Sequence, residues 1–404
     1  MRKPRGAVLI IYLTLFVDVI GLGIIYPILP RMIQHLVGGD LSLSSQYGGW
    51  LMFLYSLMQF FFAPVLGAIS DQYGRRPVIL LSLLGFGIDY IFLGFAPTIF
   101  WLFIGRTISG ITGASFTTAN AYIADISTDE NRAKNFGRVS AMFGLGFIIG
   151  PSLGGILSHH FGDRFPFIFS AGLAFLNFLL GLWFLPESLN RENRRKFEWL
   201  RANPFKTLLR LGQFPKNFLL IAALFCIYFA DQATQSSWTY YTIQKFGWSD
   251  QWVGYSLGFV ASMIVLVQGF ALGLITARLG LKNSIYLGCL LSVIGFLSFS
   301  LATKGWMMFI FMIPFALGGI AGASIKSLIT ADFPANEQGE LQGSLTSILS
   351  ISTILGPLFM TNLFSYFSRK SAPVYFPGAP FLAAAVLLSL SLFLVYRSFN
   401  KNPA

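Results

Sequence analysis

Two long apolar runs of the chain are joined by the stretch Gly67-Ala-Ile-Ser-Asp71-Gln-Tyr-Gly74-Arg75-Arg76-Pro77. The first run ends near Ile69, and the next one begins at Val78. A connection this short, carrying two adjacent arginines, predicts a tight turn on the cytoplasmic side of two membrane-spanning helices. The stretch therefore predicts an integral membrane protein.

The composition supports the same conclusion. The 404 residues are 55% hydrophobic and 11% charged, with a mean hydropathy of +0.67. A soluble domain would carry about 25% charged residues. The net charge of +12 does not predict nucleic-acid binding, because the basic residues are scattered between apolar runs rather than gathered on one face.

The sequence contains few residues suited to chemistry. Cys226 and Cys289, the two cysteines, both lie in apolar runs and form no disulfide or metal-binding pattern. His35, His159 and His160 are expected in short solvated loops. No nucleophile and base pair or phosphate-binding loop is evident. We therefore expect a protein that is not an enzyme and that needs no metal or cofactor.

Counting apolar runs predicts the fold class. A helix needs about 20 mostly apolar residues to cross about 30 Å of hydrocarbon. The runs are too long and too uniform for barrel strands. The first, after Met1-Arg-Lys-Pro-Arg5, is expected to be an uncleaved span rather than a signal peptide. We expect an all-α membrane protein with twelve transmembrane helices at about 8–32, 47–69, 78–95, 99–123, 135–157, 165–185, 217–243, 252–277, 284–302, 306–330, 341–366 and 379–396.

The basic residues predict the orientation. With both termini in the cytoplasm, most of the 28 basic residues lie on the cytoplasmic side, as the positive-inside rule requires. The longest loop is charged and central. It divides the chain into an N-terminal six-helix bundle (1–186), a cytoplasmic linker (187–216) and a C-terminal six-helix bundle (217–404). The predicted extracytoplasmic side holds Arg31, Arg164, Lys245, Lys304, Arg369 and Lys370.

An internal repeat supports two related halves. At an offset of 206 residues, Gly67 corresponds to Gly273 and Gly74 to Gly280. The pair Gly150-Pro151 corresponds in the same way to Gly356-Pro357. The offset covers an even number of spans, so both halves insert the same way up. This predicts two parallel halves, the substrate site lying between them near the membrane midplane.

Charges within the spans are functional candidates, because a charge in hydrocarbon is costly. Asp18, Asp89, Arg106 and Asp231 lie well inside predicted spans, whereas Lys326 is near enough to an end to extend to the interface. A carboxylate removed from water favours its protonated form, which suits proton transfer. Asp89 and Arg106 lie on neighbouring spans, so a buried ion pair is the alternative to a direct role in proton coupling or substrate binding.

The repeat assigns these charges to one half. The second half keeps the glycines and has lost the charges, since Leu224, Gly295, Met312 and Ala277 stand at the positions that correspond to Asp18, Asp89, Arg106 and Asp71. We therefore expect proton handling in the first half and a substrate cavity shaped mainly by the second.

Two glycine-rich motifs lie within spans. Gly110 and Gly113 follow Arg106 in the fourth span and allow a neighbouring helix to approach closely. In the fifth span, small residues permit tight packing and the proline removes a backbone hydrogen bond, which predicts a bend. Ordinary packing of spans is the alternative reading of both. The residues of this helix-bend motif are Gly146, Gly150, Pro151, Gly154 and Gly155.

The loop from Gly67 to Pro77 resembles the loop motif of the major facilitator superfamily of transporters. The likeness extends over nearly the whole chain to the bacterial tetracycline/proton antiporters. It is carried by the stretches Asp18-Val-Ile-Gly21-Leu-Gly23-Ile-Ile-Tyr-Pro27-Ile-Leu-Pro30, Gly87-Ile-Asp89-Tyr90, Gly110-Ile-Thr-Gly113-Ala, Ala121-Tyr-Ile-Ala-Asp125-Ile and Gln338-Gly-Glu-Leu-Gln342-Gly343-Ser344.

The resemblance implies a secondary transporter of the bacterial inner membrane. It would export a drug-like small molecule in exchange for protons by alternating access, as a monomer in the lipid bilayer, with no nucleic acid involved. It implies proton coupling by Asp18, Asp89 and Arg106. It also implies a cytoplasmic gate that comprises Gly67, Asp71, Gly74, Arg75, Arg76, Asp125 and Arg132, in which Asp71 and an arginine form a charged latch with the segment 125–132.

Two positions depart from the family pattern. Ser292 stands where those antiporters carry an aspartate in the ninth span, and Ile264 where they often carry a histidine in the eighth. The departures predict a substrate other than tetracycline. They also motivate an alternative, a proton-coupled carrier of a metabolite or siderophore.

Amides and aromatic side chains suggest the substrate cavity. Such side chains suit a small molecule that is partly apolar and partly polar. Helix packing or the outer rim is the alternative location for each of them. The predicted cavity residues are Gln59, Asp231, Gln232, Gln235, Trp238, Tyr241 and Gln268.

Overall fold

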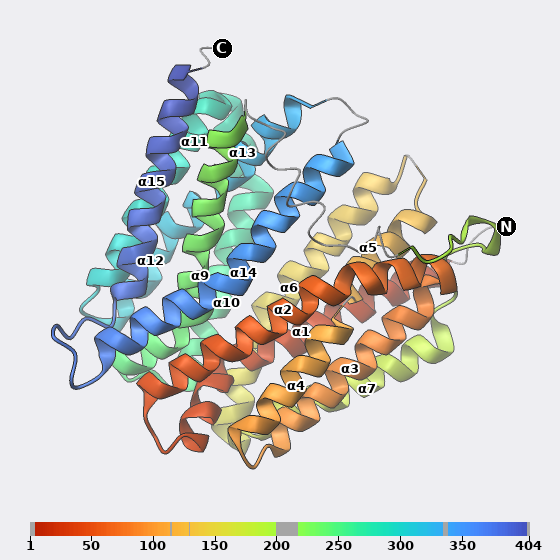
Figure 1. Cartoon of the computed structure of the whole chain (residues 1–404), viewed down its shortest axis with the longest axis horizontal. Helices are drawn as coiled ribbons and strands as arrows, with labels where there is room; N and C mark the ends of the chain where they lie inside the picture. Colours follow the sequence, from red (N-terminus) through yellow and green to blue (C-terminus); the bar gives the residue numbers. More distant parts are fainter. Residues whose placement is uncertain (1–4, 114, 129, 199–216, 334–337, 402–404) are drawn as a thin grey trace. The chain divides into compact units, whose positions relative to one another are not determined.

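The computed structural model describes residues 5–113, 115–128, 130–198, 217–333 and 338–401, and these residues form helices and connecting turns without any strand (Figure 1). Part of the predicted linker, residues 199–216, lies outside the described residues. The helices that precede it are α1 (Arg5–Leu36), α2 (Leu41–Tyr73), α3 (Arg75–Phe95), α4 (Ile99–Thr112), α5 (Ser115–Ile126), α6 (Arg132–Phe161), α7 (Phe165–Phe184) and the short η1 (Arg191–Asn193).

The helices that follow the linker are α9 (Phe218–Phe246), α10 (Asp250–Leu266), the π-helical turn η4 (Val267–Ala271), α11 (Leu272–Leu301), α12 (Gly305–Gly318), α13 (Ile320–Ala331), α14 (Gln338–Ser368) and α15 (Ala379–Lys401). Except at its ends, a helix pairs its backbone polar groups within one segment, which is what a membrane requires.

Eleven helical segments of the described chain are long and apolar enough to cross a membrane. The sequence analysis expected twelve. The difference arises at one segment, Asp250–Leu301, which runs for 52 residues through η4 without a separating loop. Inside this segment Gly280 has non-helical angles, with φ 74° and ψ 166°. The fold is thus all-helical with many apolar spans, and the number twelve stays a prediction.

The predicted repeat is visible in the backbone. Gly74, between α2 and α3, has φ 112° and ψ 162°, close to the conformation of Gly280. Both φ values are ones that side chains with a Cβ rarely adopt, so both turns depend on glycine. Likewise α4 ends next to Gly113 and α12 ends next to Gly319, again 206 residues apart. The predicted fourth and tenth spans are therefore each divided into two helices.

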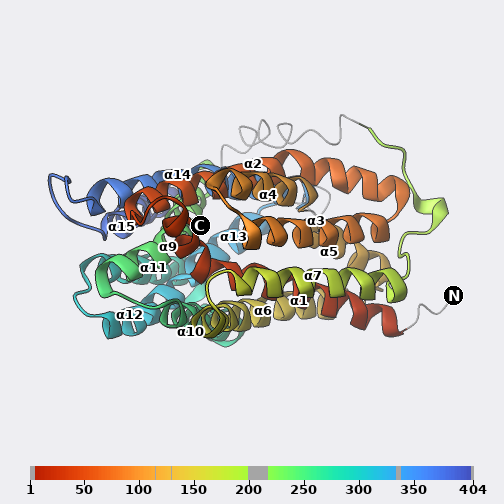
Figure 2. The same ribbon diagram turned by 90° about the horizontal axis from the view of Figure 1, so that it is seen from below.

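The same helix pairs pack in both halves of the sequence. Before the linker, α1 packs against α6 and α7, and α3 packs against α4, α5 and α7 (Figure 2). After it, α9 packs against α14 and α15, and α11 packs against α12, α13 and α15. Every one of these pairs corresponds to its counterpart at the repeat offset. The repeat thus preserves packing partners as well as glycines.

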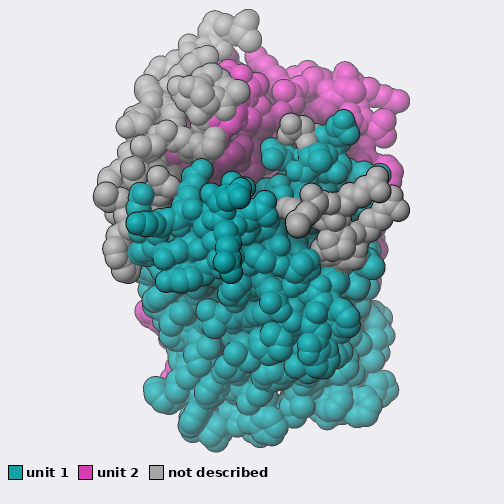
Figure 3. Space-filling model, turned by 90° about the vertical axis from the view of Figure 1, so that its right-hand side faces the viewer, with its two compact units in different colours: residues 1–39, 54–204, 249–258 teal, residues 40–53, 205–248, 259–404 magenta. Residues whose placement is uncertain are grey.

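The described chain forms two compact units, coloured separately in Figure 3. Unit 1 comprises residues 1–39, 54–204 and 249–258, and unit 2 comprises residues 40–53, 205–248 and 259–404. The start of α2 therefore belongs to unit 2, and the start of α10 belongs to unit 1. These two exchanged segments correspond to each other at the repeat offset. The predicted division into 1–186, 187–216 and 217–404 follows chain order and stays a prediction.

Glycines let α6 approach α1 closely. A Cβ at Gly23 would lie 2.9 Å from Cδ of Pro151, and one at Gly150 would lie 2.9 Å from Cα of Gly23. Gly154 meets the backbone of Ile24 in the same way. Small residues at these positions replace hydrophobic attraction, which is weak between helices in lipid, with close backbone packing. The bend predicted at Pro151 stays a prediction.

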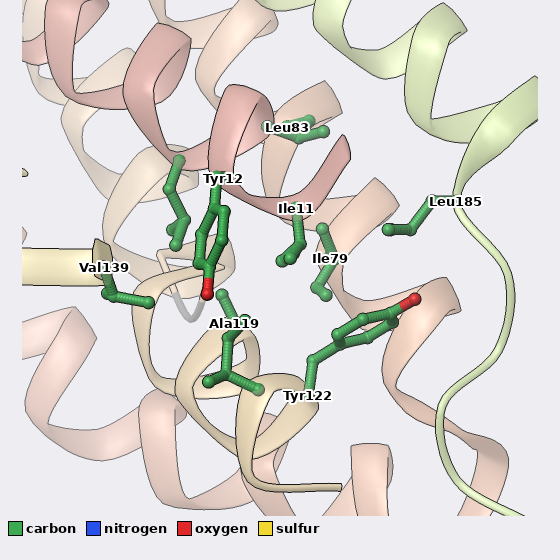
Figure 4. Close-up of a cluster of buried hydrophobic side chains, with 10 residues drawn as sticks. Ile11, Tyr12, Ile79, Leu83, Ala119, Tyr122, Val139 and Leu185 are labelled. Carbon is green, nitrogen blue, oxygen red and sulfur yellow. The ribbon is translucent and has the colours of Figure 1, made fainter. Parts of the chain in front are cut away.

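At the end of unit 1 where α1 begins, side chains from five segments form a buried cluster (Figure 4). Two tyrosines give it polar anchors. Tyr12 donates a hydrogen bond to Oδ1 of Asn135 at 3.1 Å, and Tyr122 donates one to the carbonyl of Pro186 at 2.9 Å. Its buried members are Ile11, Tyr12, Leu15, Ile79, Leu83, Ala119, Tyr122, Ile123, Val139 and Leu185. The cluster holds the ends of α1, α3, α5 and α6 at fixed positions near the Gly67–Pro77 turn.

The expectation that the histidines lie in loops is wrong. His35 is in the last turn of α1, and His159 and His160 are in the last turn of α6. Histidine is favourable there because a helix C-terminus attracts positive charge. Both helices continue beyond the predicted apolar runs, since a helix can extend past the hydrocarbon with polar residues.

Candidate functional site

Asp18 is buried in the middle of α1, with 8% of its surface exposed. Its Oδ2 accepts a hydrogen bond of 2.7 Å from Oγ of Ser115, the first residue of α5. The interruption of the fourth span next to Gly113 is what brings this serine to the start of a helix. Among the described residues, no salt bridge involves Asp18. The carboxylate therefore has a neutral donor within a buried setting.

Asp89 and Arg106 form a buried ion pair between α3 and α4. Nε of Arg106 donates to Oδ1 of Asp89 at 3.3 Å, and Nη2 contacts Oδ2. Asp89 is fully buried and Arg106 is 8% exposed. The guanidinium carbon lies 5.7 Å from the centre of the Tyr55 ring. The ion pair that the sequence analysis gave as one of two readings is present.

Gly105 makes room for this pair. A Cβ at Gly105 would lie 2.7 Å from Oδ1 of Asp89. A buried pair that loses one partner leaves an uncompensated charge, which typically costs about 3–5 kcal/mol. The two acids of unit 1 thus have different surroundings, since Asp89 has a cation and Asp18 has a hydroxyl.

At the turn between α2 and α3, Arg75 joins two acidic residues, and we name Asp71, Arg75, Asp125 and Glu187 the turn cluster. Nη1 of Arg75 lies 2.5 Å from Oδ1 of Asp71, and its Nε lies 3.2 Å from Oδ2 of Asp125 on α5. Nη1 also donates to Oγ of Ser70 at 2.7 Å. One guanidinium therefore links the end of α2 to the end of α5.

Glu187 is a member of the turn cluster that the sequence analysis missed as a site residue. Its Oε1 accepts a hydrogen bond of 2.8 Å from the backbone N–H of Arg75, and its Oε2 accepts one of 3.2 Å from that of Arg76. These N–H groups open α3 and have no partner within the helix. A carboxylate from a residue more than 100 positions later thus caps α3, and it favours the positive end of the helix dipole.

The first residues after α7 return to the turn. Ser188 donates from Oγ to Oδ2 of Asp125 at 2.9 Å, and the N–H of Arg195 donates to the carbonyl of Asp71 at 3.1 Å. The only sequence signal for this was an acidic residue directly after an apolar run, in Pro186-Glu187-Ser188. Periodicity cannot reveal a contact made across the fold.

The other predicted gate residues either contact neighbouring backbone groups or are exposed. Nη2 of Arg76 donates to the carbonyl of Leu182 at the end of α7. The carbonyl of Gly67 accepts a hydrogen bond of 2.7 Å from Oγ of Ser70. Arg132 begins α6 with an exposed side chain. The structure therefore brings together Asp71, Arg75 and Asp125, while Arg132 stands apart from their contacts.

The predicted cavity residue of unit 1, Gln59, has a structural partner. Its Nε2 donates a hydrogen bond of 2.9 Å to the carbonyl of Gly113. That carbonyl belongs to the end of α4, where helix carbonyls lack partners. The contact accounts for an amide at this position, and a role toward substrate stays a prediction.

The predicted cavity residues of unit 2 fall into two groups. Trp238 and Tyr241 are buried against Phe299 and Phe381, and Oη of Tyr241 donates to the carbonyl of Phe299 at 2.5 Å. Gln232 is buried against Gly356 of α14. The more accessible group consists of Asp231, which is half-buried, together with the exposed Gln235 and Gln268.

The two departures from the family pattern are packing positions. Ser292 of α11 is 8% exposed, and a Cβ at Gly318 of α12 would lie 2.9 Å from its Cα. Ile264 of α10 packs against the apolar cluster of Val267, Ala316 and Ile320. The grouping of His, Cys, Asp and Glu in the described residues offers no metal site.

Buried charges on apolar helices, with charged turns at the helix ends, are the features of a multi-pass membrane transporter. Residues 11–357 match the family model described as Major Facilitator Superfamily. The chain belongs to this superfamily, and it is a transporter rather than an enzyme.

Curated relatives are similar over most of their length. The chain is 38% identical to the tetracycline resistance protein, class C, of Escherichia coli, over 90% of this chain and 91% of the relative. It is 36% identical to the class G protein of Vibrio anguillarum, over 98% and 99%. A crystal structure of a bacterial homologue of the human lysosomal transporter Spinster has a TM-score of 0.77 at 19% identity, covers 100% of both chains, and supports the fold alone.

Proposed function

We propose that this transporter is a proton-coupled antiporter that exports a drug-like small molecule by alternating access. The observation that carries the proposal is Asp18, a buried carboxylate whose hydrogen-bond donor is the neutral hydroxyl of Ser115. A carboxylate in such a setting can gain and lose a proton with little rearrangement. The relatives named tetracycline resistance proteins support a substrate that resembles an antibiotic.

We further propose a topology of twelve spans in two parallel halves, with both termini cytoplasmic in a bacterial inner membrane and the monomer as the working unit. The long segment Asp250–Leu301 would count as two spans that meet at Gly280. A single helix of this length would be about 78 Å long, far beyond the roughly 30 Å of hydrocarbon. The matching turn at Gly74 supports this reading.

In this proposal, Asp18 carries the transported proton, and Asp89 with Arg106 sets the charge around it. Arg106 keeps the charge of Asp89 balanced when Asp18 is ionised, and protonation of Asp18 removes one negative charge from the buried interior. No cofactor takes part, because the proton gradient supplies the energy. Substitution of Asp18 would then uncouple transport, whereas loss of Arg106 would also destabilise the fold.

The turn cluster is proposed to act as the cytoplasmic gate. Arg75 holds the ends of α2 and α5 together through Asp71 and Asp125. Separating these helix ends requires breaking at least one of the two pairs. The cluster would therefore set the rate of the conformational change and not the affinity for substrate.

For the substrate, the accessible polar side chains of unit 2, Asp231, Gln235 and Gln268, are the better candidates. The uncharged Ser292 and Ile264 favour a second candidate function, a proton-coupled carrier of a metabolite or siderophore. The two functions differ in the molecule that crosses the membrane, and both use the same proton site.

The test is transport in everted membrane vesicles from cells that lack their own efflux pumps. A pulse of tetracycline or another drug should release protons from energised vesicles, and Asp18→Asn should reduce drug-driven proton release by about 10-fold or more. Asp40→Asn, at an exposed position on the start of α2, is the matched control. Normal drug uptake and proton release by both Asp18→Asn and Asp89→Asn would contradict the proposal. A panel of siderophores and metabolites then tests the second candidate.

A further inference from the structure

A second polar cluster lies in unit 1, at the end of α1 and α6 opposite to the turn cluster. Its centre is Asp250, the first residue of α10, which belongs to the exchanged segment 249–258. The Asp250 side chain is 6% exposed, and its Oδ1 lies 2.7 Å from Nε of Arg31. The Arg31 side chain is 33% exposed, so the start of α10 is held to the end of α1 by a partly buried ion pair.

A chain of polar contacts leads from Asp250 to the surface. Oγ of Ser158 on α6 lies 2.9 Å from Oδ2 of Asp250 and 2.9 Å from Oδ1 of Asp163. Oδ2 of Asp163 lies 3.3 Å from Nδ1 of His35. The side-chain exposure rises along the chain, from 6% at Asp250 to 25% at Asp163 and 67% at His35.

The geometry at Ser158 has a consequence for protons. A serine hydroxyl has one hydrogen to donate, yet two carboxyl groups lie at hydrogen-bond distance from its oxygen. When both carboxyl groups are ionised they share this one hydrogen, whereas a proton on either carboxyl group lets that group donate to the serine oxygen and gives two full hydrogen bonds. The arrangement of Asp163, Ser158 and Asp250 therefore favours the binding of one proton.

The rest of the exchanged segment packs through small residues. A Cβ at Gly155 of α6 would lie 2.9 Å from Cα of Gln251, and one at Gly258 would lie 2.9 Å from the carbonyl of Ile148. Gly254 meets the carbonyl of Pro151 in the same way. Such contacts allow a close fit but add little apolar attraction. The segment is also held by the buried side chain of Val253 and by a hydrogen bond of 3.3 Å from Oγ of Ser152 to the carbonyl of Gly254, and the ion pair adds a charged contact to these.

The equivalent segment in unit 2 is attached through serine hydroxyl groups. In residues 40–53, Ser42 bonds to Ser365 and Ser45 bonds to the carbonyl of Thr361, while Gly49 meets Pro357. At the repeat offset, Asp250 corresponds to Ser44. Hydroxyl contacts do not change with pH in the physiological range. The exchanged segment of unit 1 is attached through an ion pair, whereas Ser42 and Ser45 attach the segment of unit 2 through hydroxyl groups.

We propose that Arg31, Asp250, Ser158 and Asp163 form a proton-sensitive latch on the predicted extracytoplasmic side, which holds the start of α10 until a proton enters from that side. The latch rests on the proposed antiport, in which extracytoplasmic protons drive the cycle. Protonation of Asp250 removes its attraction for Arg31, so the segment 249–258 can leave unit 1. The charged and titratable groups around the latch are His35 on α1, His159 and His160 at the end of α6, and Arg164 at the start of α7.

The test follows the buried segment directly. Ser256 in this segment is fully buried, so Ser256→Cys in a Cys226→Ala/Cys289→Ala background reports when the segment becomes accessible. In intact cells at about pH 7.5, a membrane-impermeant maleimide should label this cysteine about fivefold or more faster in Asp250→Asn or Arg31→Gln than in the parent. The double variant should be no faster than either single variant, because both remove one interaction. Asp40→Asn at the start of the equivalent helix should change the rate by less than about twofold.

The dependence on pH separates a latch from a merely structural pair. A protonated Asp250 is uncharged, as asparagine is. The labelling rate of Asp250→Asn divided by that of the parent should therefore fall below about twofold at about pH 5.5. Both proteins carry the same reporter cysteine and are labelled at the same pH. Ionisation of its thiol therefore affects both labelling rates equally and does not change their ratio. Ser158→Ala keeps the pair with Arg31 but breaks the path from Asp163, and it should keep slow labelling at neutral pH while weakening the response to acid.

Three outcomes would overturn the proposal. They are labelling that neither Asp250→Asn nor Arg31→Gln accelerates, a rate ratio that does not vary with pH, and acceleration only with a membrane-permeant maleimide. Labelling needs no drug and no proton gradient. A latch that behaves as expected in a protein without drug-driven proton release would therefore refute the proposed antiport and leave the latch standing.

Discussion

The two copies of the repeated turn share a backbone and differ in almost every charge contact. Gly74 and Gly280 both have positive φ, and each separates two apolar runs. In the first copy, Arg75 joins Asp71 to Asp125, and Glu187 caps α3. In the second copy, Ala277 and Leu281 replace Asp71 and Arg75, and Lys282 lies 5.1 Å from the centre of the Phe399 ring.

The comparison separates a structural requirement from a functional one. A chain that reverses between two helices needs glycine in both copies, because φ is positive. Charges are not needed to make the turn, since the second copy has none of the acidic partners. The charges of the first copy therefore serve something other than the turn, and we assign them to the gate.

The largest effect is expected from Arg75→Gln. This substitution leaves Asp71 and Asp125 without their shared cation, and solvent screens part of the loss because the Asp71 side chain is 45% exposed. Transport should slow by about 10-fold or more, while the equilibrium dissociation constant for the drug stays within about twofold. Vesicle transport and equilibrium binding measure the two quantities. A variant that loses binding instead would assign the turn to the substrate site.

A smaller effect is expected from alanine at the two glycines. Gly74→Ala and Gly280→Ala both force a Cβ into positive φ with extended ψ, a region essentially restricted to glycine, at a cost of about 1–3 kcal/mol. Gly74 is buried beneath the carboxylate of Glu187, whereas Gly280 is exposed with no atom within 4 Å of its Cβ position. Thermal unfolding in detergent should therefore show a larger loss of stability for Gly74→Ala. Equal losses would mean that Glu187 does not bear on this turn.

Next in size is Glu187→Gln, which keeps the shape of the cap and removes its charge. The interaction of the carboxylate with the start of α3 should weaken by about 0.5–1 kcal/mol. The midpoint of thermal unfolding should fall modestly and transport should slow by about two- to fivefold. Glu192→Gln in η1, an exposed position close in sequence, is the matched control and should leave both unchanged. An effect equal to that of the control would remove Glu187 from the turn cluster.

The smallest effect is expected from restoring the missing charges of the second copy. Ala277→Asp with Leu281→Arg rebuilds the pair of Asp71 and Arg75 at the repeat offset. No third partner would be present, because Ala331 and Phe393 correspond to Asp125 and Glu187. An exposed pair of this kind contributes about 0.3–0.5 kcal/mol, so transport should change by less than about twofold. A marked slowing would show that two charges alone make a latch.

Much of the fold was predictable because membranes impose simple rules. Apolar runs must be helices, and the glycine offset revealed the repeat that the backbone at Gly74 and Gly280 displays. The pair of Asp89 and Arg106 was a stated alternative, because two opposite charges on neighbouring spans have few other partners. The splitting of the fourth span at Gly113 was not foreseen, since local hydropathy is the same on either side.

By itself, the sequence determined that this is an all-helical membrane transporter with its buried charges concentrated before the linker, because hydrocarbon penalises every unpaired polar group. Only the tertiary structure decided which partners those charges have. Glu187 reaches α3 across more than 100 residues, and Asp250 reaches Arg31 across more than 200. Contacts at such separations depend on how helices pack side by side, which no pattern along a single helix records.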